Sequence, residues 1–158
     1  MKIQLLLMGK TRFPFIKDGV EEYKKRLKRY ADFNIRVLPD LKNAGSLPQP
    51  KYMQEEGKTI IKTLSPDKYV VLLDERGKEM DSIEFAEYID LQHQASRKSI
   101  VFVVGGAYGF SPEVYERGNM LLSLSKMTYS HQIIPLFFIE QLYRAFTIIR
   151  GAPYHHRS

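Results

Sequence analysis

Short apolar runs alternate along the chain with longer segments in which apolar residues recur every three or four positions. A continuous apolar run of this length is typical of a strand that is covered on both faces of a sheet. Apolar residues that recur every three or four positions are typical of an amphipathic helix. The predicted strands are Lys2–Met8, Phe33–Leu38, Lys68–Asp74 and Ser99–Val104, followed by a second C-terminal apolar run that ends at Leu124.

The predicted helices occupy the segments between these runs. Asp81 and Glu84 have the spacing of a capping box, in which the first side chain caps the helix and the second reaches back to its start. Ser111 and Pro112 mark another start, because serine caps helices and proline suits the first helical position. The predicted helices are Phe15–Tyr30, Tyr52–Leu64, Asp81 to about Ala95, a short helix from Ser111, and Ile134–Ile149; Pro39–Pro50 is predicted as a loop and Asp74–Lys78 as a charged turn.

The order of these elements predicts the fold class. Strands that alternate with helices form α/β folds built on a parallel sheet. The chain has 158 residues and shows neither an internal repeat nor a linker. We therefore expect one α/β domain over residues 1–158, large enough to bury a core.

The last predicted helix is apolar around most of its circumference. Its narrow polar stripe contains Glu140, Tyr143, Arg144 and Thr147. Such a helix needs cover on several sides, and in so small a chain we expect a second subunit to provide part of it, giving a homodimer. Pro135 would break a helix interior, so we expect it in the first turn.

Composition excludes several kinds of chemistry. The chain contains no cysteine, which rules out disulfides, thiolate zinc sites and a cysteine nucleophile and fits a cytoplasmic protein. No apolar run approaches the roughly 20 residues that span a bilayer, and the first ten residues lack the longer apolar region of a signal peptide. We therefore expect no association with a membrane.

The net charge of +6 leaves two interpretations open. It fits an ordinary basic protein and equally a protein that binds nucleic acid. The polar face of the segment Phe15–Tyr30 carries six cations, but Glu21 and Glu22 lie four residues before Lys25 and Arg26 and can pair with them. That face is either solvated or in contact with an RNA backbone.

A ligand site is expected beyond the carboxyl ends of the strands, as in other open parallel sheets. The candidate strand ends are Leu73-Asp74, Val104-Gly105 and Leu124-Ser125. Glycines at 105 and 106 allow the backbone to approach a ligand closely. The turn they open has neither the spacing of a dinucleotide fingerprint nor the lysine of a P-loop, so it is either a tight connection or one wall of a site.

The segment Leu122–His131 is rich in hydroxyl groups. Its backbone amides can hydrogen-bond an adenine edge, and Leu124 and Met127 can pack on the ring. The alternative is a polar loop that caps the following helix, and chemistry alone leaves both open. The hydroxyl residues are Ser123, Ser125, Thr128 and Ser130.

Several motifs follow one another in a recognisable order. In the last third they are Val103–Gly109, Leu124–Gln132, Ile139–Phe146 and Tyr154-His155. Weaker matches nearer the start are Gly9-Lys10, Glu22–Leu27 and Lys51–Gly57. Together they resemble the ribosomal large-subunit pseudouridine N3-methyltransferases (the rRNA large subunit methyltransferase H family), which are small SPOUT methyltransferases, over nearly the whole chain.

The resemblance implies a fold, a cofactor and a substrate. The fold is a three-layer helix–sheet–helix SPOUT domain whose C-terminal part, about residues 99–158, is threaded into a deep trefoil knot, although general topology rules discourage knots. It also implies a homodimer that binds S-adenosylmethionine at the knot and methylates N3 of a pseudouridine in 23S rRNA on the assembled 70S ribosome. The implied cofactor-binding residues are Leu73, Gly105, Leu124, Ser125, Lys126, Met127, Thr128 and Tyr129.

Catalytic roles are predicted for Arg144, Tyr154 and His155. The N3 atom of pseudouridine must lose a proton, so a base or a group that stabilises the anion is expected. Tyr154 and His155 would reach across the dimer to the partner's pocket, unless they belong to a disordered terminus. Arg144 would hold a phosphate or the developing negative charge, and it can also pair with Glu140, four residues earlier.

Two positions depart from the pattern expected of this family. Pro135 stands where a basic or polar residue is expected, so one RNA contact is expected to be missing. Ser130 stands where proline is common, so the rim of the pocket is expected to be looser.

Other functions remain open at this point. The same fold and cofactor could serve a tRNA, or the chain could be a non-catalytic RNA-binding or ribosome-assembly protein. A metal-dependent hydrolase that uses His131, His155 and His156 is disfavoured, because no cluster has ligand spacing on a firm element. We expect no metal.

Overall fold

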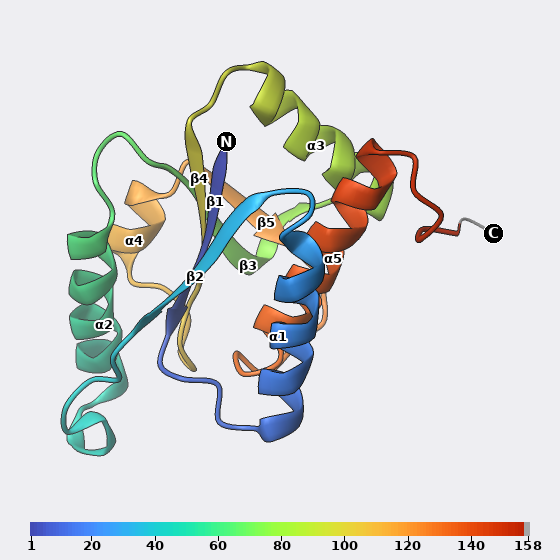
Figure 1. The fold of residues 1–158 in the computed structure, drawn as a ribbon. Helices are drawn as coiled ribbons and strands as arrows, with labels where there is room; N and C mark the ends of the chain where they lie inside the picture. Colours follow the sequence, from blue (N-terminus) through green and yellow to red (C-terminus); the bar gives the residue numbers. More distant parts are fainter. Residues whose placement is uncertain (157–158) are drawn as a thin grey trace.

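A parallel β-sheet forms the centre of the molecule (Figure 1). The computed structural model describes residues 1–156, in which five parallel strands are ordered β2-β1-β4-β3-β5. This confirms the predicted α/β class and its parallel sheet. The strands are β1 (Lys2–Met8), β2 (Asp32–Leu38), β3 (Tyr69–Glu79), β4 (Ser99–Val104) and β5 (Met120–Ser123).

Helices cover both faces of the sheet, so the domain has the three predicted layers. One face is covered by α1, α3 and α5, and the other by α2 and α4 (Figure 1). None of the helices within residues 1–156 is long and apolar enough to cross a membrane. The helices are α1 (Pro14–Leu27), α2 (Gln49–Thr63), α3 (Ser82–Gln94), α4 (Pro112–Arg117) and α5 (Ile134–Ile149), with a 3-10 turn at Ala44–Ser46.

The strand β4 shows why its run of apolar residues is continuous. Ile100 and Phe102 face the core under α1, α3 and α5, whereas Val101 and Val103 face the core under α2 and α4. Successive side chains of a strand point to opposite faces, and here each face is buried under helices. A strand in this position has no solvent side on which a polar residue would be favoured.

Phe138 on α5 is expected to be among the costliest core positions to truncate. It is fully buried, and its ring centroid lies 4.6 Å from that of Phe102. Phe138→Ala should lower the free energy of unfolding by about 3–5 kcal/mol, because it leaves a cavity that the packed sheet cannot fill. Urea unfolding measures the loss. Leu91→Ala, at a position 59% exposed on α3, should cost no more than about 0.5 kcal/mol, and equal losses would contradict this assignment of the core.

Three predicted boundaries are wrong, and two of them lie beside the candidate site. Away from the site, the helix predicted to reach Tyr30 ends at Leu27. The predicted charged turn Asp74–Lys78 is part of β3, which continues to Glu79 after a shift in its pairing with β5. Gly77 makes this possible, since a Cβ there would lie 2.6 Å from the Leu121 carbonyl carbon. α2 begins at Gln49 within the predicted loop Pro39–Pro50, because proline is tolerated in the first turn of a helix.

The helix α5 lies between α1 and α3, and its cover is incomplete. Phe138, Leu142 and Ala145 are fully buried. Phe137 is 37% exposed, and several other apolar side chains of α5 are only half-buried. Pro135 lies in the first turn, as predicted. The homodimer and the trefoil knot stay predictions.

Candidate functional site

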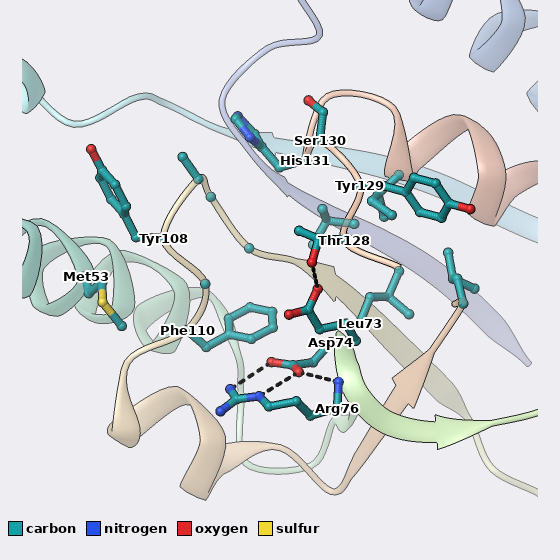
Figure 2. A pocket seen from close by; sticks show the side chains of 18 of the residues that line it. Met53, Leu73, Asp74, Arg76, Tyr108, Phe110, Thr128, Tyr129, Ser130 and His131 are labelled. Atoms are coloured by element: carbon teal, nitrogen blue, oxygen red, sulfur yellow. Dashed lines mark hydrogen bonds and ion pairs between the residues drawn. The ribbon is translucent and has the colours of Figure 1, made fainter. Parts of the chain in front are cut away.

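A cavity of about 930 Å³ opens beyond the carboxyl ends of β4 and β5 and beside the middle of β3, where its pairing with β4 ends at Leu73. The sequence indicated these three places, although β3 itself does not end at Asp74. The volume lies in the range of small-molecule and cofactor sites. Figure 2 shows its lining side chains from close by. The lining residues are Gln49, Met53, Leu73, Asp74, Glu75, Arg76, Val104, Gly105, Gly106, Ala107, Tyr108, Gly109, Phe110, Pro112, Tyr115, Leu122, Leu124, Ser125, Met127, Thr128, Tyr129, Ser130, His131 and Ile134.

The glycine turn after β4 forms one wall. Gly109 has a positive φ of 79°, which glycine adopts without strain, and its N–H donates to the Gly106 carbonyl at 3.2 Å. A Cβ on Gly105 would lie 3.0 Å from the Phe110 ring. The turn therefore folds tightly over Phe110 and exposes its backbone to the cavity.

The polar segment after β5 forms the opposite wall, and its hydroxyl groups hold its shape. Ser123 Oγ donates to the Ser125 carbonyl at 2.8 Å, and Ser125 Oγ accepts from the Met127 N–H at 3.0 Å. Thr128 Oγ1 donates to Glu75 at 2.5 Å, which ties this wall to β3. Ser130 Oγ accepts from the Gln132 N–H at 3.2 Å just before α5. The segment thus bounds the cavity and leads into α5, but no side chain of it caps that helix, whose N-cap is Ile133. Its part in ligand binding stays a prediction.

A cluster of acidic and basic side chains in the middle of β3 lines another part of the cavity (Figure 2). Asp74 accepts from the Arg76 guanidinium at 3.1 and 3.2 Å, and the Tyr115 hydroxyl donates to the same carboxylate. Although burial raises the pKa of Asp74, the hydrogen bonds from Arg76 and Tyr115 bring its pKa below the usual value. Burial and the Asp74 charge raise the pKa of Tyr115 to about 12. The sequence indicated Asp74 as a strand end but gave no signal for its two partners.

His131 is the histidine that lines the cavity within the described residues. Burial, followed by the nearby Arg12 charge, lowers the pKa of its imidazole, while Asp40 acts in the opposite direction. His131 is therefore neutral at neutral pH. No group of three or more His, Asp and Glu side chains within residues 1–156 is arranged to hold a metal ion.

The cavity collects most of the residues predicted to bind a cofactor. Seven of the eight line it: Leu73, Gly105, Leu124, Ser125, Met127, Thr128 and Tyr129. Lys126 does not, because its side chain is 83% exposed and its amine lies 3.6 Å from Glu79. Their part in binding stays a prediction.

The three residues predicted to be catalytic form a separate cluster at the end of α5. Arg144 donates to Glu140 at 2.6 Å, and one of its guanidinium nitrogens lies 3.3 Å from Nδ1 of His155. Tyr154 donates to the same Glu140 oxygen at 3.1 Å. The predicted ion pair between Glu140 and Arg144 is confirmed, and it coexists with the contact to the tail.

Helix α1 holds this cluster from the side. The hydroxyls of Tyr23 and Tyr154 are 3.1 Å apart. Burial and this hydrogen bond raise the pKa of Tyr154. Partial burial lowers the pKa of Arg144, but the hydrogen bond to Glu140, the charge of Glu140 and the two nearby tyrosines together raise that pKa above its ordinary value, so the guanidinium stays charged.

The cluster of Arg144, Tyr154 and His155 lies apart from the cavity in a single chain. None of Arg144, Tyr154 and His155 is among the described residues that line the cavity. Figure 1 shows the tail after α5 extending away from the body of the domain. His156 is exposed. A site that used both parts would need a second copy of the chain.

Sequence reasoning assigned no role to the α2 side of the cavity. Met53 lines it, and the Tyr52 ring meets the Tyr108 ring edge-on, with centroids 5.3 Å apart. Tyr52 and Met53 belong to the weak motif Lys51–Gly57, which was the available signal. Helical periodicity favoured this segment as a packing surface, and nothing in it indicated a ligand.

Comparison with known proteins gives a consistent result along the whole chain. A family model described as "Predicted SPOUT methyltransferase" matches residues 1–155. Three similar proteins carry the name "Ribosomal RNA large subunit methyltransferase H". The protein from Parabacteroides distasonis is 48% identical over 156 residues, which cover 99% of each chain. Those from Christiangramia forsetii and Flavobacterium johnsoniae are 45% and 43% identical over 157 residues, which cover 99% of this chain and 100% of theirs.

Proposed function

Because this chain belongs to the SPOUT methyltransferase family, we propose that it transfers a methyl group from S-adenosylmethionine to N3 of a pseudouridine in 23S rRNA, acting on assembled 70S ribosomes in the cytoplasm. The observation that carries the proposal is the similarity, over nearly the full length, to proteins named for large-subunit ribosomal RNA methylation. The net charge of +6 is in keeping with a polyanionic substrate.

The cavity suits the proposed donor. Leu73, Leu124 and Met127 offer apolar contacts for a flat ring, and Gly105 leaves room for close approach to the backbone. The hydroxyl groups of the segment after β5 hold its backbone in a fixed shape, which favours specific hydrogen bonds to the adenine edge. When bound, S-adenosylmethionine supplies an activated methyl group, so the protein's part is to orient the acceptor and to manage its proton.

The tail cluster has the groups that this proton transfer needs. His155 would accept the N3 proton at Nδ1, the ring nitrogen that takes a hydrogen bond from Arg144 in the free chain, because the neutral ring then carries its hydrogen on Nε2. Arg144, whose charge is held by Glu140, would stabilise the negative charge that develops on the base or bind a flanking phosphate. Tyr154 would orient both through Glu140.

A homodimer would join the cavity of one copy to the tail of the other. In support of a dimer, aromatic side chains lie exposed near the starts of α1 and α5: Phe13, Phe15, Tyr129 and Phe137. Phe13 contacts Phe15, and Tyr129 contacts Phe137. Such a patch on a small domain is typical of an interaction surface.

Lys126 is expected to be dispensable for donor binding. Its amine points away from the cavity toward Glu79. Lys126→Ala should leave the affinity for S-adenosylhomocysteine within about twofold of the wild type, because only an exposed ion pair is lost. Calorimetric titration measures this. Leu124→Ala is the comparison, since Leu124 lines the cavity and its truncation should weaken binding by about tenfold.

The proposed substrate class is tested with labelled S-adenosylmethionine and three acceptors. These are purified 70S ribosomes, free 50S subunits and bulk tRNA. We expect label in the large-subunit RNA of 70S ribosomes and none in tRNA. Label in tRNA alone would keep the family activity and overturn the substrate. Donor binding without transfer to any acceptor would point to a missing partner or assembly state, whereas neither transfer nor donor binding would favour a non-catalytic RNA-binding protein.

A further inference from the structure

Glu56 is a buried acidic residue that the proposed reaction does not use. It lies on α2 and is 2% exposed. Its Oε1 atom accepts the Gly106 backbone N–H at 2.9 Å. Burial raises the pKa of Glu56, and the bonds from Gly106 and Tyr52 offset this only in part, while Asp40 adds to it. A buried carboxylate costs stability unless it is paired, so the presence of Glu56 at this position needs a physical reason.

Helix α2 packs against the glycine turn after β4, and Glu56 makes one of the contacts that hold this turn. The carboxylate holds the first part of the turn through Gly106, and a Cβ on Gly106 would collide with it. One turn earlier on the same helix face, Tyr52 meets Tyr108 of the turn edge-on. Past Glu56, a Cβ on Gly57 would collide with Ser111, where α4 begins. Helix α2 therefore lies against this segment at Gly106, Tyr108 and Ser111.

We infer that Glu56 is a positioning residue of the donor pocket, whose carboxylate fixes the Gly105–Gly109 turn in the conformation that receives S-adenosylmethionine. The inference rests on the proposed function, since it takes the cavity as the donor site. Met53 lies on the same stretch of α2 and lines the cavity, so the helix that supports the turn also borders the ligand. An ionised acceptor binds an N–H about twice as strongly as a neutral one, which explains a carboxylate where an amide would fit.

If Glu56 is a positioning residue, its replacement should weaken donor binding without lowering the stability of the fold. Because the folded-state pKa of Glu56 is raised, the folded protein loses stability as pH rises from the ordinary glutamate pKa through the raised one. At pH 8 a neutral residue of the same shape avoids that cost. Glu56→Gln should therefore unfold at the wild-type temperature or above it, yet bind the donor more weakly.

The test is calorimetric titration of S-adenosylhomocysteine into the full-length protein, with thermal unfolding of each variant at pH 8. Glu56→Ala should raise Kd by about tenfold, because the Gly106 N–H loses its acceptor, and Glu56→Gln by about threefold. Glu55→Ala is the matched control. The Glu55 side chain is paired with Lys51 and Lys58 at the surface, and its loss should change neither value.

Two results would overturn the inference. One is wild-type affinity in both Glu56 variants. The other is a loss of affinity that follows a lowered unfolding temperature in both, which would make Glu56 a folding residue. A wild-type protein that does not bind S-adenosylhomocysteine would overturn the donor pocket itself, and the proposed function with it.

Discussion

Replacing His155 with alanine is expected to slow methyl transfer by about a hundredfold or more, the usual contribution of a positioned proton acceptor. Nδ1 of His155 lies 3.3 Å from the Arg144 guanidinium, outside the cavity of its own chain. The affinity for S-adenosylhomocysteine and the unfolding temperature should therefore stay at their wild-type values. Single-turnover methylation of 70S ribosomes, with calorimetric titration of the same preparation, measures both.

His156→Ala is the matched control for this substitution. His156 is the next residue and is exposed, so its loss should leave turnover unchanged. If both variants turn over at the wild-type rate, the proton acceptor lies elsewhere, and His131 within the cavity becomes the first candidate. If both lose activity equally, the tail acts through its order or charge and no single imidazole is responsible.

A mixed dimer with one Gly105→Val copy and one His155→Ala copy is expected to recover about half of the wild-type activity, although each homodimer is nearly inactive. A valine at 105 meets the Phe110 ring and obstructs the close approach of a ligand to the backbone at this wall of the cavity. In the mixed dimer, the intact cavity of one copy faces the intact tail of the other, so one of two composite sites survives. Two affinity tags, one on each copy, allow this dimer to be purified for the methylation assay.

The same two substitutions placed on one copy provide the control. A dimer of that doubly substituted copy with a wild-type copy has no composite site and should be inactive. If the site lay within one chain, the outcomes would be reversed: the doubly substituted pairing would keep half of the activity and the first pairing would have none. A protein that remains monomeric at assay concentrations would also contradict the proposed dimer.

The main features of the fold follow from the sequence because they depend on side chains that face the core. The run Ser99–Val104 predicts a central strand, since both faces of β4 are covered by helices. The capping box of Asp81 and Glu84 is present and starts α3 at Ser82. Local signals of this kind carry through to the folded chain unchanged.

The two errors beside the site have different physical causes. The charges of Asp74–Lys78 are typical of a turn, but β5 supplies a partner and Gly77 the clearance, so the strand continues. The partner strand is not visible in the sequence. Pro48 and Pro50 favour a loop, yet Pro48 occupies the N-cap position of α2 and Pro50 lies in its first turn, where proline is tolerated.

The candidate site was predictable where residues are consecutive along the chain. The glycine turn and the segment after β5 each form one wall of the cavity. The contact of Asp74 with Tyr115, and that of Glu56 with Gly106, join residues about 40 to 50 positions apart, and no periodicity in the chain links them. Lys126 was assigned to the cavity because its neighbours are there, but its side chain leaves on the solvent side.

The most direct test of the central claim is methylation of ribosomes with and without the target base. Labelled S-adenosylmethionine is offered to 70S ribosomes from a wild-type strain and from one that cannot form the large-subunit pseudouridines, and the labelled nucleoside is identified after digestion. We expect label in N3-methylpseudouridine with the first ribosomes and no label with the second. Equal labelling of both would contradict the claim, because the accepting atom would then belong to another base.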